Sequence, residues 1–123
     1  MTYSESFKDH LANPRNAGEL TNATHKAEET NPVCGDRVCL SLRIENKKIA
    51  AVKFLAYGCP PTIVCASALT EMIEGLPVDE ALRLTKQDVA NRVGGLLSRK
   101  MHAAALVIET LQAALMSYES KVD

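Results

Sequence analysis

The stretch "RVCLSLRIENKKIAAVKFLAY" at residues 37–57 decides the fold. Apolar and polar residues alternate through its first half, 37–45, which is typical of a β-strand with one buried face. A polar turn at 46–48 leads into a second predicted strand at 49–57. The two strands together form an antiparallel hairpin. Its inner face is predicted to carry Val38, Leu40, Leu42, Ile44, Val52, Phe54 and Ala56.

Matching the apolar faces of this hairpin also sets its register. Leu40 is expected opposite Phe54, and Leu42 opposite Val52. Continued outward, the same register brings Cys34 to within one position of Cys59. Residues opposed in an antiparallel pair have Cα atoms roughly 4.5–5.5 Å apart. Two thiols far apart in the sequence are therefore expected to lie close together.

The flanking segments predict helices. A short helix is expected at 4–12, with Ser4 as its cap, followed by a loop at 13–33 that holds a short edge strand near 23–29. After Pro60-Pro61 a helix is predicted to run to about residue 74 and to stop at Gly75. Two short helices follow, at 78–85 and at 85–93. The last and longest helix spans about 98–118, and its apolar stripe is expected in the core: Leu97, Met101, Ala104, Ile108, Leu111 and Leu115.

This order of elements predicts an α+β fold. Helices are expected to cover one face of a small antiparallel sheet of about three strands. The length of 123 residues suits a single domain spanning 1–123. With a net charge of −1 and no large basic block, neither nucleic acid nor a membrane surface is an expected partner. No export signal is visible, so a cytoplasmic location is expected.

Four cysteines in a chain without an export signal indicate metal or redox chemistry rather than a disulfide framework. Cys59 comes just before a predicted helix N-terminus, which favours the thiolate form. Cys34 faces it across the hairpin, and Asp36 lies beside Cys34. These residues could form a metal site, a nucleophile with a helper group, or a turn without chemistry. Cys39 points away from the apolar face and is not expected to be a ligand.

Two further residues stay open at this point. Cys65 heads an apolar stripe with Leu69 and Met72, which favours core packing, although side chains on a helix lean back toward its N-terminus and so toward the Cys59 loop. His102 lies in the first turns of the last helix and matters only if that helix start meets the cysteine loops. His10 and His25 are expected to be surface or satisfied core residues.

The chain resembles the IscU/NifU-type iron–sulfur cluster assembly scaffolds over nearly its whole length. The matching segments are "YSESFKDHLANPRNAGEL" at 3–20, "NPVCGD" at 31–36, "AYGC" at 56–59, "ASALTEMIEG" at 66–75 and "DEALRLTKQDV" at 79–89. The resemblance implies that Cys34 and Cys59 are cluster ligands, and that Asp36 is the carboxylate that binds metal and keeps the cluster labile. His102 falls on the histidine of the "K-x-H-C" element in this family.

The chain departs from the family at several positions. The third cysteine of the family is Ala103 here, and Cys65 stands where the family usually has serine. The glycine-serine stretch after the second cysteine is replaced by Pro60-Pro61. The chaperone segment has become "LLSRK" at 96–100, so chaperone docking does not follow from the resemblance.

The first hypothesis is a scaffold, not an enzyme, that builds a transient cluster of the 2Fe-2S type and hands it on. The implied partners are a cysteine desulfurase and apo recipient proteins, and a homodimer stays open. We expect Cys34, Asp36, Cys59 and His102 to hold the cluster, with Cys65 as a reserve thiol. The alternative is a zinc-binding paralogue that uses the same four residues as a closed site. A thiol enzyme that uses Cys59 and His102 ranks last.

Overall fold

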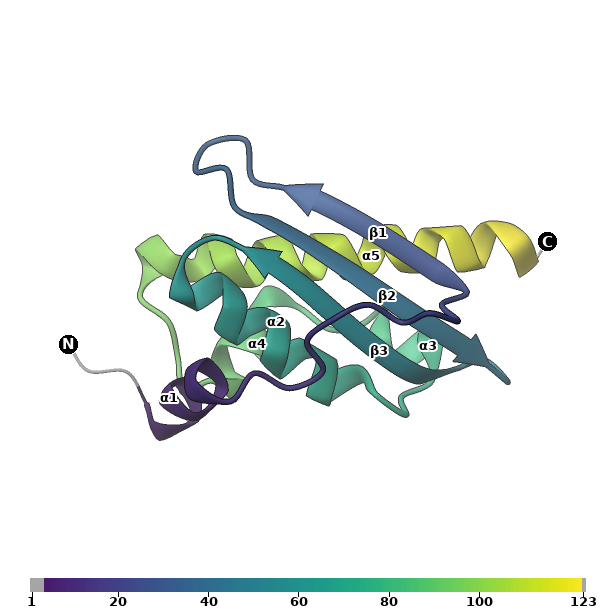
Figure 1. Ribbon diagram of the computed structural model, residues 1–123, viewed down its shortest axis with the longest axis horizontal. Helices are drawn as coiled ribbons and strands as arrows, with labels where there is room; N and C mark the ends of the chain where they lie inside the picture. Colours follow the sequence, from purple (N-terminus) through teal and green to yellow (C-terminus); the bar gives the residue numbers. More distant parts are fainter. Residues whose placement is uncertain (1–3, 123) are drawn as a thin grey trace.

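The computed structural model describes residues 4–122, and the side chains of 4–116. It contains a three-stranded antiparallel sheet in the order β1-β2-β3 (Figure 1). The strands are β1 (His25–Thr30), β2 (Arg37–Glu45) and β3 (Lys48–Tyr57). The predicted hairpin and edge strand are thus confirmed, and so is the register, since Leu40 pairs with Phe54 and Leu42 with Val52.

The hairpin closes through a two-residue turn. Asn46 and Lys47 have φ angles of 53° and 64°, the left-handed values that a tight hairpin turn of the right twist requires. The register shifts between Arg43 and Ile44, so that Ile44 pairs with Ile49. This irregularity is confined to the turn end of the hairpin. The register predicted from the apolar faces therefore holds from there to the end where the cysteines lie.

Helices cover one face of the sheet, as predicted. In chain order they are α1 (Glu5–Ala12), α2 (Pro60–Ile73), α3 (Val78–Ala81), α4 (Lys86–Arg92), the 3₁₀ turn η1 (Ser98–Lys100) and α5 (Met101–Val122). Helices α2 and α5 lie side by side behind the sheet (Figure 1). The core between the layers includes Leu40, Leu42, Leu69 and Leu111. The last helix begins with a 3₁₀ turn at Ser98, and its α-helical part starts at Met101.

The segment after α1 has a role that the sequence did not reveal. Gly18 N–H donates to the Phe54 carbonyl at 2.8 Å, and Phe54 N–H donates to the Asn16 carbonyl at 2.9 Å. These bonds cover the outer edge of β3 over a stretch that was predicted as loop. Helix α1 itself is tied to α2 through buried His10, whose Nδ1 lies 2.7 Å from Ser67 Oγ. His25 is also buried, and its Nδ1 lies 2.8 Å from Thr24 Oγ1.

Four elements converge at one end of the molecule. The loop before β2, the end of β3, and the starts of α2 and α5 all meet there (Figure 1). Every residue singled out from the sequence as a cluster ligand lies on one of these four segments. Among the described residues, the structure contains no helix that is both long and apolar enough to cross a membrane.

Candidate metal centre

The loop that carries Cys34 is shaped by Asn31. Its Oδ1 accepts the backbone N–H of Val33 at 2.9 Å and that of Cys34 at 3.4 Å. Its backbone carbonyl also accepts the N–H of Gly35, whose φ of 81° lies in the left-handed region. Asparagine closes such turns with its own side chain, and glycine accepts the positive φ without strain. The local sequence thus turns the chain so that the Cys34 side chain is exposed at the tip.

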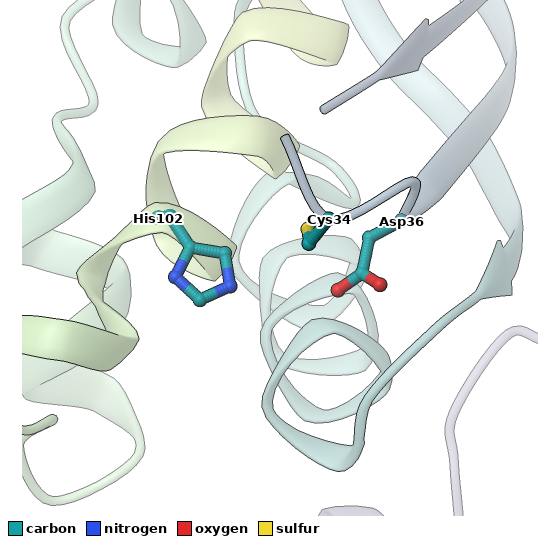
Figure 2. Close-up of side chains that lie close together, drawn as sticks. All are labelled: Cys34, Asp36 and His102. Atoms are coloured by element: carbon teal, nitrogen blue, oxygen red, sulfur yellow. The ribbon is translucent and has the colours of Figure 1, made fainter. Parts of the chain in front are cut away.

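Three side chains gather between this loop and the start of α5. Cys34, Asp36 and His102 each offer a ligand atom, and these atoms lie within 4.8 Å of one another (Figure 2). Cys34 and Asp36 come from the β1–β2 loop, whereas His102 comes from α5. A sulfur, a carboxylate oxygen and a ring nitrogen at such separations are a donor set that iron or zinc accepts. The helix start and the cysteine loop do meet, which was the condition set for His102.

Asp36 is the hub of this site. The residue is only 7% exposed, and its Oδ2 accepts hydrogen bonds from Thr62 Oγ1 at 2.7 Å and from the Cys59 thiol at 3.2 Å. Burial alone would raise the pKa of the Asp36 carboxyl. The hydrogen bonds from Thr62, from Cys59 and from the Cys34 thiol outweigh burial, so the pKa lies below its ordinary value. Asp36 is therefore held as a carboxylate, the form that binds a metal ion.

Cys59 is connected to the site by its hydrogen bond to Asp36, not by the pairing of β2 with β3. The ladder of β2 and β3 ends at the pair Arg37–Tyr57, so the two cysteines lie in loops beyond it. Gly58, with a φ of 155°, lets the second loop approach, because a Cβ there would collide with the Asp36 carboxylate. Both thiols therefore contact the Asp36 carboxylate, but Cys59 is not among the three residues whose ligand atoms lie within 4.8 Å of one another, and its place as a ligand stays a prediction.

His102 presents one particular nitrogen for a ligand. Its Nδ1 lies 3.1 Å from the Arg99 carbonyl oxygen, which can only accept a hydrogen bond. Nδ1 therefore carries the proton, and Nε2 keeps the lone pair with which a neutral imidazole binds a metal. The backbone of η1 thus selects the tautomer that suits ligation.

The other two cysteines lie elsewhere. Cys65 has no exposed surface and packs in the core with Leu69, as its apolar stripe predicted. Burial, together with the nearby Cys59, raises the pKa of the Cys65 thiol to about 12. A neutral thiol is a poor ligand and a poor nucleophile. Cys39 is half-buried opposite Leu55, on the sheet face away from the core.

The site is open to the exterior on one side. A pocket of about 290 Å³ adjoins it, lined by Asn31, Val33, Cys34 and His102. Val33 is 94% exposed at the rim of this pocket. One buried donor, Asp36, and an open side next to the exposed Cys34 are what a site needs if its cargo is to enter and leave without unfolding.

Sequence reasoning missed two residues that shape this site, Asn31 and Thr62. Asn31 stands just before a proline at the head of the cysteine loop, a position typical of a turn-forming asparagine. Thr62 stands three residues after Cys59, on the first turn of α2. The spacing from Cys59 indicates that Thr62 lies near that cysteine, but its contact with Asp36 can be seen only in the folded structure.

The chain is similar to proteins of a known family. It matches the family described as "NifU-like N terminal domain" over residues 2–123. It is 40% identical over 121 residues to the "Iron-sulfur cluster assembly scaffold protein IscU" of Aquifex aeolicus, covering 97% of this chain and 77% of that protein. It is 37% identical over 119 residues to the "Iron-sulfur cluster assembly scaffold protein IscU 1" of Archaeoglobus fulgidus, covering 97% and 78%.

A solved structure agrees with these relatives. The crystal structure of a "Putative iron-sulfur cluster assembly scaffold protein for SUF system" from Fervidobacterium islandicum superposes with a TM-score of 0.76. That match has 25% sequence identity and covers 92% of this chain and 96% of the other. The fold, the order of motifs and the relatives agree, and the chain belongs to the NifU-like N-terminal domain family.

Proposed function

We propose that this protein is a scaffold on which an iron–sulfur cluster is assembled and from which it is handed to recipient proteins. The observation that carries the proposal is the donor set of Cys34, Asp36 and His102 beside an open pocket, with the Cys59 thiol hydrogen-bonded to Asp36. The relatives named as scaffolds, at 37–40% identity over nearly the whole chain, support the same function. They do not favour the alternative of a closed zinc site without assembly activity.

The residues divide into strong and weak ligands. Cys34 and Cys59 supply thiolates, which bind cluster iron firmly. Asp36 supplies a harder oxygen donor and His102 a nitrogen donor, and both are poorer matches for cluster iron than sulfur is. A scaffold needs this mixture, because it must hold its cargo and then release it. The cluster itself, proposed to be of the 2Fe-2S type, is the cargo of this site.

The proposal also carries finer expectations. The sulfur would come from a cysteine desulfurase and the cluster would go to apo iron–sulfur proteins in the cytoplasm. Because the third cysteine of the family is Ala103 here, Cys34 or Cys59 would have to accept the sulfur. Cys65 stays a reserve thiol in this account, although its burial argues against ligation. Zinc could occupy the same donors when iron is absent.

Anaerobic reconstitution tests the proposal. The protein would be incubated with ferrous iron, cysteine, a cysteine desulfurase and a dithiol reductant that converts the delivered sulfur to sulfide, and then separated and assayed for bound iron, bound sulfide and visible absorbance. We expect equimolar iron and sulfide in the parent, and neither in Cys34→Ala or Cys59→Ala. Cys39→Ala is the matched control, because its thiol lies on the far sheet face. Unchanged cluster content in both ligand variants would refute the site.

A further inference from the structure

The helix that follows Cys59 begins with two prolines. Pro60 and Pro61 occupy the first two positions of α2 and have no N–H to donate. The next two N–H groups, of Thr62 and Ile63, are directed to the Cys59 carbonyl at 3.0 and 3.4 Å. A helix start normally offers free backbone N–H groups to an anion. This one cannot donate from its first two residues to the charged groups gathered at the site.

The side-chain hydroxyl of Thr62 takes the place of the backbone N–H donors that the two prolines lack. Thr62 is fully buried, and its Oγ1 donates to Asp36 Oδ2 at 2.7 Å. The same hydroxyl lies 3.5 Å from the Cys59 sulfur. A buried hydroxyl is thus placed between a candidate carboxylate ligand and a candidate thiolate ligand.

Other helical threonines in this chain behave differently. Thr110 donates to the Leu106 carbonyl one turn back at 2.8 Å, and Thr70 donates to the Ser67 carbonyl at 2.7 Å. That is the ordinary use of a buried threonine hydroxyl on a helix. Thr62 gives its proton to a side chain of the site instead.

We propose that Thr62 is the positioning residue for Asp36 and sets its strength as a metal ligand. In the metal-free site, Thr62 and the Cys59 thiol both hold Oδ2. When Cys59 binds a metal, its proton leaves to solvent and its hydrogen bond to Asp36 is lost. The Thr62 hydroxyl then remains as the side-chain donor that holds Oδ2, beside the backbone N–H of Cys59 on the same carboxylate, and Oδ1 is left for the metal. Hydrogen bonds that orient a ligand carboxylate are typically worth about 10- to 100-fold in metal affinity.

The test uses Co²⁺ alone, added to the metal-free protein. This ion suits mixed sulfur, oxygen and nitrogen donors, and its visible absorption reports thiolate ligation directly. Affinity would be measured by competition with a chelator in the parent, Thr62→Val and Thr62→Ser. The same measurements on Asp36→Ala and on the double variant Asp36→Ala/Thr62→Val complete a cycle that isolates the coupling of the two residues.

We expect Thr62→Val to weaken Co²⁺ binding by about tenfold or more, and Thr62→Ser to bind like the parent. In the Asp36→Ala background, Thr62→Val should change the affinity by less than about twofold. Equal losses in both backgrounds, parent-like affinity in Thr62→Val, or failure of serine to restore binding would each overturn the inference. The matched control Thr110→Val removes a buried helical hydroxyl far from the site and should leave Co²⁺ affinity unchanged.

This inference rests on the proposed function in one respect, that the site takes a metal. The two can fail separately. A parent that binds Co²⁺ with the expected dependence on Thr62 but never accumulates iron and sulfide would refute the scaffold function and leave the role of Thr62 in place. A parent that assembles a cluster but shows no coupling between Thr62 and Asp36 would refute only the inference.

Discussion

The Asp36 carboxylate has two roles: it links two loops to α2 by hydrogen bonds, and it serves as the weak ligand. Replacing Asp36 by alanine removes both, and the two effects can be measured separately. The substitution removes the acceptor of the Thr62 hydroxyl and of the Cys59 thiol. Thr62 is fully buried, so its hydroxyl would be left without this acceptor. A buried polar group that loses its hydrogen bond costs about 1–3 kcal/mol, and thiols are weak donors that add little.

We therefore expect the metal-free Asp36→Ala protein to be less stable by about 2 kcal/mol. For a domain of this size that corresponds to a fall in Tm of roughly 5–10 °C. Urea unfolding of the metal-free protein measures the difference. Asp36→Asn is the control, because its amide oxygen still accepts from Thr62, and it should lose less stability than the alanine variant. Parent-like stability of Asp36→Ala would refute the role of Asp36 as a hub.

The same variant should hold its cluster longer once the cluster is bound. Asp36 supplies an oxygen donor that competes poorly for cluster iron and admits an exchanging ligand. Without it, loss of visible absorbance under a chelator should slow by about threefold or more, since even a modest difference in ligand free energy has that effect. Faster decay than in the parent would contradict the exchange role.

Three further results are expected. Burial and the Arg15 charge lower the pKa of His10 below 6.5, so the unfolded state binds a proton on His10 more readily than the folded state does. The free energy of unfolding is therefore at its full value above about pH 6.5 and falls below that pH. Urea unfolding measured across pH should show this dependence, and it should disappear in His10→Gln. In the reconstituted protein, after one-electron reduction of the cluster to its paramagnetic state, pulsed electron paramagnetic resonance should detect a nitrogen ligand that vanishes in His102→Ala and persists in Cys65→Ser. The reverse pattern would make Cys65 the third ligand. Gly58→Ala should displace Asp36 and lower Co²⁺ affinity by about tenfold, whereas Gly75→Ala, also at positive φ but with open space around it, should affect stability alone.

The fold was largely predictable because its signals are local and periodic. Alternation over 37–45 fixed the buried face of β2, and matching it to β3 fixed the register that the structure shows. The apolar stripe that begins at Cys65 correctly placed that thiol in the core. Periodic patterns report which face of an element is buried, and burial determines how the elements stack.

The details of the site were predictable only in part. Cys34 and Cys59 could be brought near one another by register, but the ladder stops before either of them. What joins them is the network of bonds to Asp36, and no pattern in the sequence specifies where a carboxylate or a threonine hydroxyl will point. The edge pairing of Asn16 and Gly18 with Phe54 was hidden for the same reason, since it uses backbone groups that any sequence possesses.

The central claim is that this site builds a cluster and gives it away. The most direct measurement is transfer from the reconstituted protein to an apo-ferredoxin, followed by circular dichroism in the visible range in the presence of a chelator that traps free iron. We predict that holo-ferredoxin forms while the scaffold loses its cluster in equal amount, and that the chelator does not prevent it. A cluster that stays on the protein, or iron that passes to the chelator before any reaches ferredoxin, would contradict the account.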